Sequence, residues 1–247
     1  MKAVYIMWLR QIIRYWRSRA RMIGALGQPV LFFLALGFGF GPVYAKAGAG
    51  NYIEFLAPGI MAMTILFTSM FAGMEVIWDR QFGFLKETMV APVPRWQIML
   101  GKTLGGATIA VIQAMVVFII TLFFGFYINW YLFPLALVFM FIMALAFTAL
   151  GIAIASKMED MQAFPIVMNF LVMPIFFLSG ALFPLDNLPK AVAFLTSINP
   201  LSYGVDGLRG ALANASHYGL GADLIILVIV TFALLSLGTY LFSKIEV

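Results

Sequence analysis

Three consecutive residues, Gly101-Lys102-Thr103, have the types that close a phosphate-binding loop: a glycine, a lysine and a hydroxyl residue. That motif also requires a glycine five residues before Gly101, and position 96 is Trp96. It further requires a strand before it and a soluble helix after it, whereas a long apolar run follows Thr103. The sequence therefore argues against ATP binding by this chain.

No other residue pattern indicates catalysis or metal binding. The sequence has no Cys, which excludes disulfides, thiol catalysis and Cys-ligated metals. Its single His, His217, has no second His and no carboxylate cluster near it in the sequence, so we interpret it as an ordinary loop or interface residue. We expect no enzymatic activity, no bound cofactor and no metal site in this chain.

The composition is that of a membrane protein. Of the 247 residues, 64% are hydrophobic and only 10% are charged, and the mean hydropathy is +1.03. A soluble domain carries about 25% charged residues, so this chain has too few charges to cover a surface that faces water. The net charge of +5 flanks apolar runs, which is typical of membrane topology and not of nucleic-acid binding. The predicted fold class is a single all-α integral membrane domain over residues 1–247.

Six apolar runs approach the ~20 residues that a transmembrane helix needs. The length of the first run favours an uncleaved span over a signal peptide. Pro29 and Pro174 are expected to kink the first and fifth spans. The predicted spans cover about residues 22–41, 55–78, 103–127, 132–155, 163–183 and 222–242.

The orientation follows from the distribution of lysine and arginine. Twelve of the fifteen lie in the N-terminal segment, the loops 79–102 and 156–162, and the C-terminal tail, which all fall on the same side of the predicted spans. The positive side of a membrane protein faces the cytoplasm. Both termini are therefore predicted to be cytoplasmic.

Residues 1–21 are predicted to form an amphipathic helix that lies flat in the membrane interface. Arginines share one stripe of the helix and aromatic rings the opposite face, so the arginines are expected to face water or anionic lipid. The helix serves either as a topology anchor or also as a contact for a cytoplasmic partner. The residues predicted to lie at the membrane interface are Trp8, Arg10, Arg14, Trp16 and Arg17.

The stretch 79–102 is the longest charged interruption on the predicted cytoplasmic side. Apolar residues alternate there with charged ones, which predicts a short amphipathic helix at about 80–90. Pro92 and Pro94 end that helix and stiffen the link to the third span. This stretch is interpreted as the place where a soluble partner pushes on the membrane domain.

The predicted outer side is dominated by residues 184–221, which are too apolar for a free loop and too rich in proline for a span. Short re-entrant helices in the outer leaflet are expected there. Asp206 and Arg209 lie three residues apart, so on a helix they could form a structural pair.

Two further features bear on transport and packing. Glu75 is the only charge clearly inside a predicted span, and it is expected to reach the interface or to accept a helix N-terminus or an arginine. Ion-coupled carriers usually need buried carboxylates near the midplane, so their scarcity argues against such a mechanism. Gly101 and Gly105 form a G-x-x-x-G pattern, which indicates a close helix contact either within the chain or across a dimer.

The runs GFLKETMVAPVPRWQIMLGKTLGG (83–106) and NPLSYGVDGLRGAL (199–212) resemble the permease subunits of the ABC-2 family of ATP-binding-cassette exporters. The resemblance covers nearly the whole chain, and the pattern E-x-x-x-A-P-V-x-R from Glu87 to Arg95 is fairly specific at this position. It implies a bacterial inner-membrane protein that dimerises with an identical or a different permease. It also implies two separate cytoplasmic ATPases, which bind the ATP and magnesium.

The resemblance places the coupling helix of such permeases within 79–95 and a second ATPase contact in the 156–162 loop. The implied ATPase-coupling residues are Phe82, Leu85, Lys86, Glu87, Met89, Pro92, Val93, Pro94, Arg95, Glu159 and Asp160.

The predicted function is that of the membrane subunit of an ATP-driven exporter for a hydrophobic or amphipathic substrate such as a drug, a lipid or a glycan. Two alternatives stay open: a secondary transporter or channel that works without an ATPase, and a membrane scaffold that transports nothing. Spans rich in Phe and Met suit both an apolar substrate and a lipid-facing surface, so the sequence does not identify the substrate.

Overall fold

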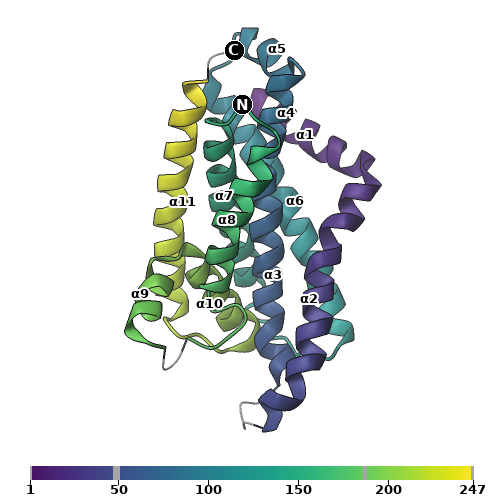
Figure 1. Ribbon diagram of the computed structural model, residues 1–247, viewed down its shortest axis with the longest axis vertical. Helices are drawn as coiled ribbons and strands as arrows, with labels where there is room; N and C mark the ends of the chain where they lie inside the picture. The colour runs from purple at the N-terminus through teal and green to yellow at the C-terminus, as the bar shows by residue number, and fades with distance from the viewer. Residues whose placement is uncertain (1, 47–50, 186–187, 246–247) are drawn as a thin grey trace.

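The computed structural model describes residues 2–46, 51–185 and 188–245. Across these residues it is entirely helical, without strands (Figure 1). The helices are α1 (Lys2–Arg17), α2 (Arg19–Lys46), α3 (Tyr52–Phe71), α4 (Met74–Gln81), α5 (Phe84–Val90), α6 (Arg95–Phe123), α7 (Phe133–Ala155), α8 (Ala163–Phe177), α9 (Lys190–Ile198), α10 (Pro200–Ala213) and α11 (Leu220–Ser243).

Five helical stretches of the described residues are long and apolar enough to cross a membrane. They are α2, α3 together with α4, α6, α7 and α11, and they coincide with five of the six predicted spans. The agreement is closest for α7, predicted at 132–155 and found at Phe133–Ala155. Helix α6 differs most, because it begins at Arg95, eight residues before the predicted start at 103.

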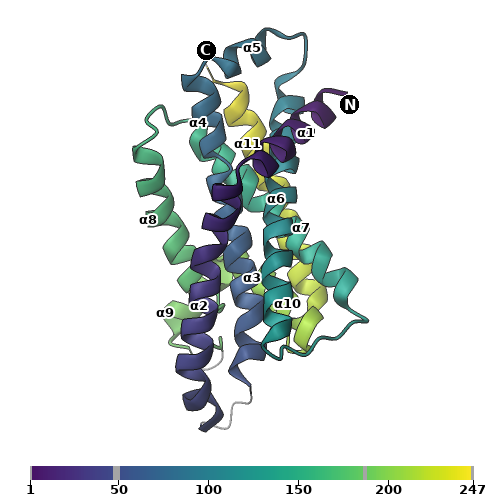
Figure 2. The same cartoon turned by 90° about the vertical axis from the view of Figure 1, so that its right-hand side faces the viewer.

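The predicted fifth span, 163–183, is occupied by a shorter helix. Helix α8 has 15 residues, which gives a length of about 22 Å at 1.5 Å per residue, against an apolar bilayer core of about 30 Å. The helix ends at Phe177, and Gly180 then takes a left-handed conformation with φ 73°. Helix α8 and the segment after it lead the chain from the end of the bundle that carries α4 to the end that carries α9 and α10 (Figures 1 and 2).

Helix α3 is the centre of the core. Its residues from Leu56 to Leu66 are all buried, and α2, α6, α7, α8 and α10 pack around it. Helix α2 is held much more loosely, since only 17% of its most apolar stretch is buried, against 72% for α3 with α4. Within the described part of the chain, one face of α2 therefore has no protein neighbour.

The two ends of the bundle carry different elements. Helices α1, α4 and α5 and the last turn of α11 lie at one end, and α9 and α10 lie at the other (Figures 1 and 2). The short helices predicted between 184 and 221 are present. Helix α10 does not lie on a surface, however, because twelve of its fourteen residues are buried against neighbouring helices.

Candidate functional site

Helix α5 presents exposed apolar side chains at one end of the bundle. Phe82 and Phe84 are 71% and 51% exposed, and Val90 is 86% exposed. Gly83 makes the sharp corner between α4 and α5 possible because it takes a left-handed conformation with φ 78°. Leu85 is 1% exposed and holds the helix onto the bundle. Leu85 therefore anchors α5 to the bundle, and the coupling role predicted for it and its neighbours stays a prediction.

The proline elbow after α5 is fastened to the C-terminal end of α11. Arg95 Nη1 donates hydrogen bonds to the backbone oxygens of Ser243, at 2.6 Å, and Ile245, at 3.0 Å. A cation beside the last carbonyls of a helix is favourable because those carbonyls have no partner within the helix. Pro92 and Pro94 are exposed on this elbow. The predicted stiff link is thus also tied to the last long helix.

The 156–162 loop, predicted as a second partner contact, lies beside the end of α4. Arg80 Nη2 is 3.2 Å from Glu159 Oε1, and Gln81 Nε2 donates to the Glu159 backbone oxygen at 3.1 Å. Asp160 Oδ1 accepts a hydrogen bond from the Gln162 backbone nitrogen at the start of α8. The two predicted coupling segments therefore form one continuous surface. Its exposed members are Phe82, Lys86, Glu87, Pro92, Pro94, Arg95, Glu159 and Asp160, with Met89 and Val93 half-buried.

Beneath this surface lies a buried charged cluster around Asp79. Its Oδ1 accepts from Arg10 at 3.0 Å and lies 3.4 Å from Arg14, and its Oδ2 pairs with Lys102. The side chains of Asp79 and Lys102 are only 3% and 2% exposed. The sequence analysis assigns both residues to the loop 79–102 and predicts no contact between them. The sequence does contain a signal for this ion pair, because an acidic residue and a lysine stand at the two ends of one charged stretch, and charges near apolar spans need a partner.

Helix α1 lies across the bundle axis against α6 (Figure 2), and its Arg10 and Arg14 reach Asp79 on α4. A Cβ added to Gly101 would lie 2.6 Å from Met7 Cβ, and one added to Gly105 would lie 2.5 Å from Gln11 Cβ. Trp8 Nε1 donates to Thr108 Oγ1 at 3.1 Å. The G-x-x-x-G pattern is therefore a packing face within the chain, and it seats α1.

The arginines of α1 are placed differently from the prediction. Arg10 and Arg14 were expected to face water or anionic lipid, but they bind Asp79, with about a third of each side chain exposed. The buried carboxylate of Asp79 attracts both guanidinium groups because its negative charge needs positive partners in the protein interior. Trp16 and Arg17 are exposed on α1, and their predicted place at a membrane interface stays a prediction.

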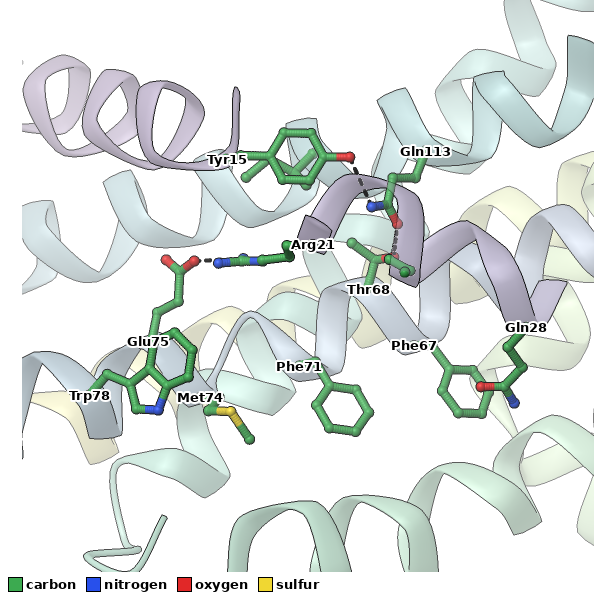
Figure 3. Close-up of a pocket in the computed structure, with 13 residues that line it drawn as sticks. Tyr15, Arg21, Gln28, Phe67, Thr68, Phe71, Met74, Glu75, Trp78 and Gln113 are labelled. Atoms are coloured by element: carbon green, nitrogen blue, oxygen red, sulfur yellow. Dashed lines mark hydrogen bonds and ion pairs between the residues drawn. The ribbon is translucent and has the colours of Figure 1, made fainter. Parts of the chain in front are cut away.

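A cavity of about 320 Å³ lies between α1 and α2 on one side and α3, α4 and α6 on the other (Figure 3). Arg21 Nη2 is 2.6 Å from Glu75 Oε1 at its edge, which confirms that Glu75 accepts an arginine. Gln113 Nε2 donates to Tyr15 Oη at 2.8 Å, and Thr68 Oγ1 donates to Gln113 Oε1 at 2.6 Å. These polar groups face the rings of Phe67, Phe71 and Trp78 (Figure 3).

At the opposite end of the bundle, Asp206 and Arg209 each hold neighbouring segments. Asp206 accepts hydrogen bonds from the Ser216 hydroxyl and from the backbone nitrogens of His217 and Tyr218 at 2.8–3.0 Å. Arg209 Nη2 donates to the Gly180 backbone oxygen at 3.0 Å. The Arg209 guanidinium also lies over the Phe55 ring, 3.9 Å from its centre. These contacts give both residues a structural role, and the predicted contact between them stays a prediction.

Two phenols, those of Tyr203 and Tyr218, lie next to each other at this end of the bundle. Burial is the main cause that raises the pKa of Tyr203 and of Tyr218, whose rings lie 5.1 Å apart. Tyr203 Oη donates to the Ser197 backbone oxygen at 2.6 Å. This end of the bundle is therefore fastened by neutral hydrogen bonds as well as by Asp206 and Arg209.

Helices of membrane length and an exposed, anchored loop helix together define a polytopic helical membrane protein. The chain belongs to the ABC-2 type transporter family, whose family model matches residues 2–213. It is 28% identical to a putative transport permease, ycf38, of Cyanophora paradoxa, over 98% of this chain and 88% of that protein.

Two further relatives match most of the chain. The chain is 31% identical to a putative transport permease, ycf38, of Pyropia yezoensis, over 81% of this chain and 70% of that protein. It is 26% identical to Nodulation protein J of Rhizobium leguminosarum bv. viciae, over 82% of this chain and 79% of that protein. The chain is thus a transport permease of the ABC-2 family.

Proposed function

We propose that this chain is the membrane subunit of an ATP-driven exporter in the inner membrane of a bacterium. It moves a hydrophobic or amphipathic substrate outward, and a separate cytoplasmic ATPase binds and hydrolyses the ATP with magnesium. Two permease chains, identical or different, pair with two such ATPases.

The observation that carries this proposal is the exposure of apolar side chains on the anchored helix α5 and on the corner before it. Phe82, Phe84 and Val90 are all more than half exposed, while Leu85 fixes α5 to the bundle. Isolated exposed apolar residues are ordinary, but a cluster at one end of a bundle marks a contact for a protein partner. Lys86 and Glu87 add charges that set the register of that contact.

Six crossings agree with the course of the chain better than five. The start of α1 and the end of α11 lie at the same end of the bundle (Figures 1 and 2), which supports an even number of crossings. We therefore assign the fifth crossing to α8 and the irregular segment after it. The excess of lysine and arginine at the α5 end supports a cytoplasmic location for that end.

The proposed mechanism depends on the connections of α5 to α4 and, through α4, to α3 and α1. Closure of the ATPases on ATP shifts residues 79–95, and α4 carries that shift directly into α3, because α4 continues the same span. The Arg10–Asp79 contact carries it into α1. Spans one, two and five, which are α2, α3 and α8, then change their packing across the dimer axis and open an outward path.

The test uses a charge reversal on α5, Glu87→Arg, and a more flexible residue in the proline elbow after it, Pro92→Gly. The permease and its co-purified ATPase are reconstituted without transported substrate. The increase in ATP hydrolysis that the permease causes is then measured for Glu87→Arg and for Pro92→Gly. We expect both to lose stimulation while the permease still inserts. Glu54→Arg, at the opposite end of α3, is the matched control and retains it.

Full stimulation in several such variants would overturn the coupling assignment. Transport in vesicles without ATP would favour a secondary transporter or channel. Binding of the ATPase with no substrate flux would favour a scaffold.

A further inference from the structure

We infer that Asp206 on α10 and Asp223 on α11 form a proton-binding site, in which one proton shared by the two carboxyl groups fastens the start of α11 to α10. Helix α10 and the start of α11 lie together at the end of the bundle opposite α5 (Figure 1). Neither the site nor its test depends on the proposed export function, since both concern a contact within this chain.

Asp223 is a completely buried acidic side chain that lacks a donor. Its exposed fraction is 0%, and neither of its carboxyl oxygens has a hydrogen-bond partner among the described residues. It is the fourth residue of α11, yet the backbone N–H groups of that first turn do not donate to it. A buried carboxylate without a donor is costly, and a carboxyl group in this setting takes up a proton instead.

Asp206 has the donors that Asp223 lacks. The Ser216 hydroxyl and the backbone nitrogens of His217 and Tyr218 donate to its two oxygens at 2.8–3.0 Å. These donors suit an ionised carboxylate, which only accepts hydrogen bonds. The two acidic side chains therefore have opposite surroundings, and one of them needs a proton while the other is equipped to accept a hydrogen bond.

The two carboxyl groups lie within hydrogen-bonding reach of each other. Two ionised carboxylates are both acceptors, so no hydrogen bond joins them and their charges repel. A proton on Asp223 turns it into a donor to Asp206, which forms a strong charge-assisted hydrogen bond and removes the repulsion. Because the two groups interact strongly, the proton belongs to the pair.

The neighbouring groups do not replace this proton. Helix α7 has no titratable residue, and those of α6, Arg95 and Lys102, lie at its opposite end. Burial raises the pKa of Tyr203 and of Tyr218, so both phenols stay neutral. The titratable or charged residues that the other neighbouring elements bring to this end are Tyr52, Glu54, Lys190, Tyr203, Arg209, His217 and Tyr218.

The shared proton makes the contact between α10 and α11 sensitive to pH. At neutral pH the carboxyl groups of an unfolded chain are ionised, whereas the folded pair keeps one proton. The folded state then binds more protons than the unfolded state, so the stability of this contact falls as the pH rises. Loss of the proton leaves two buried negative charges side by side, and we expect the loop 214–219 to loosen.

The test uses the full-length permease alone in lipid nanodiscs. Because the sequence has no Cys, Ala215→Cys supplies a single position for a spin label in the loop. From mildly acidic to alkaline pH we expect the mobile fraction of the label to rise about fivefold, the factor that one hydrogen bond gives. Infrared difference spectra over the same range are expected to show the loss of one protonated carboxyl band.

Three matched variants assign the titration. Asp223→Asn keeps the shape of the side chain and gives Asp206 a permanent donor, so the label is expected to stay immobile at every pH and the carboxyl band to disappear. His217→Gln removes the one imidazole and keeps the backbone donor to Asp206, and is expected to retain the pH profile. Glu54→Gln removes another acidic group at this end of the bundle and is expected to change neither readout.

Four results would overturn the proton site. A pH profile that persists in Asp223→Asn would exclude Asp223, and one that disappears in His217→Gln would assign the titration to histidine. The absence of a protonated carboxyl band would show that the pair binds no proton. Loss of the band without a change in the label would show that the proton does not fasten the loop. Failure of the proposed export function would appear separately, as full ATPase stimulation in the α5 variants.

Discussion

Replacing Asp79 by asparagine tests whether the charged cluster holds α1 and α4 to the bundle. The substitution keeps the size of the side chain and removes the only anion among Arg10, Arg14 and Lys102 in the described contacts of this cluster. Arg10 and Arg14 each expose about a third of the side chain and can turn toward water. Lys102 is 2% exposed and cannot.

The magnitude follows from that difference in exposure. Removal of one partner from a buried ion pair costs about 3–5 kcal/mol, because the other charge is left buried without compensation. We expect Asp79→Asn to lower the free energy of unfolding by that amount, with nearly all of the loss due to Lys102. The double variant Asp79→Leu/Lys102→Met replaces both buried charges by apolar groups and is expected to recover most of the loss.

The assay is reversible unfolding in mixed micelles, followed by hydrogen exchange of α1 under native conditions. Lys102→Met alone serves as the control, because Asp79 then keeps both arginines, and it is expected to cost less than Asp79→Asn. An unfolding free energy for Asp79→Asn within about 0.5 kcal/mol of the wild type, the usual range for surface substitutions, would show that the cluster contributes no stability.

Three further substitutions test the other contacts that hold helices and loops together. Gly105→Leu brings a side chain against Gln11 and is expected to cost about 1–3 kcal/mol and to raise hydrogen exchange in α1. Arg95→Ala frees the last carbonyls of α11, so trypsin is expected to cut after Lys244 about fivefold faster, while Arg95→Lys gives a smaller change. Asp206→Asn removes a charged acceptor from backbone donors and is expected to lower stability by about 2 kcal/mol; an unchanged melting temperature would contradict the structural role given to Asp206.

The long helices could be predicted because a span is a property of a single stretch of chain. About 20 apolar residues suffice to identify one, and α7 matches its predicted limits within a residue. The early start of α6 was missed because Arg95 and Trp96 are polar or aromatic, and hydropathy marks the membrane and not the helix. Helix α6 begins before the apolar run because Pro94 stands at its N-cap, so that Arg95 is the first helical residue.

The charged contacts could not be predicted because they join residues far apart in the chain. Arg10 and Asp79 are 69 positions apart, and periodicity on one helix says nothing about the partner of a side chain on another. A helical wheel placed the arginines of α1 on a polar face, and the structure places that face against Asp79. The G-x-x-x-G pattern left a contact within the chain and a dimer contact equally open, because small residues permit close approach without naming the neighbour.

The ion pair between Asp79 and Lys102 also bears on how such permeases can be recombined. The two residues lie on α4 and α6, directly below the segment that leaves one helix and enters the other. The ion pair therefore fixes the distance between the two helices that the segment from Phe82 to Pro94 connects. On the coupling role proposed above, we expect that this segment can be exchanged between permeases, so that a chimera accepts a different ATPase while its spans stay those of the recipient.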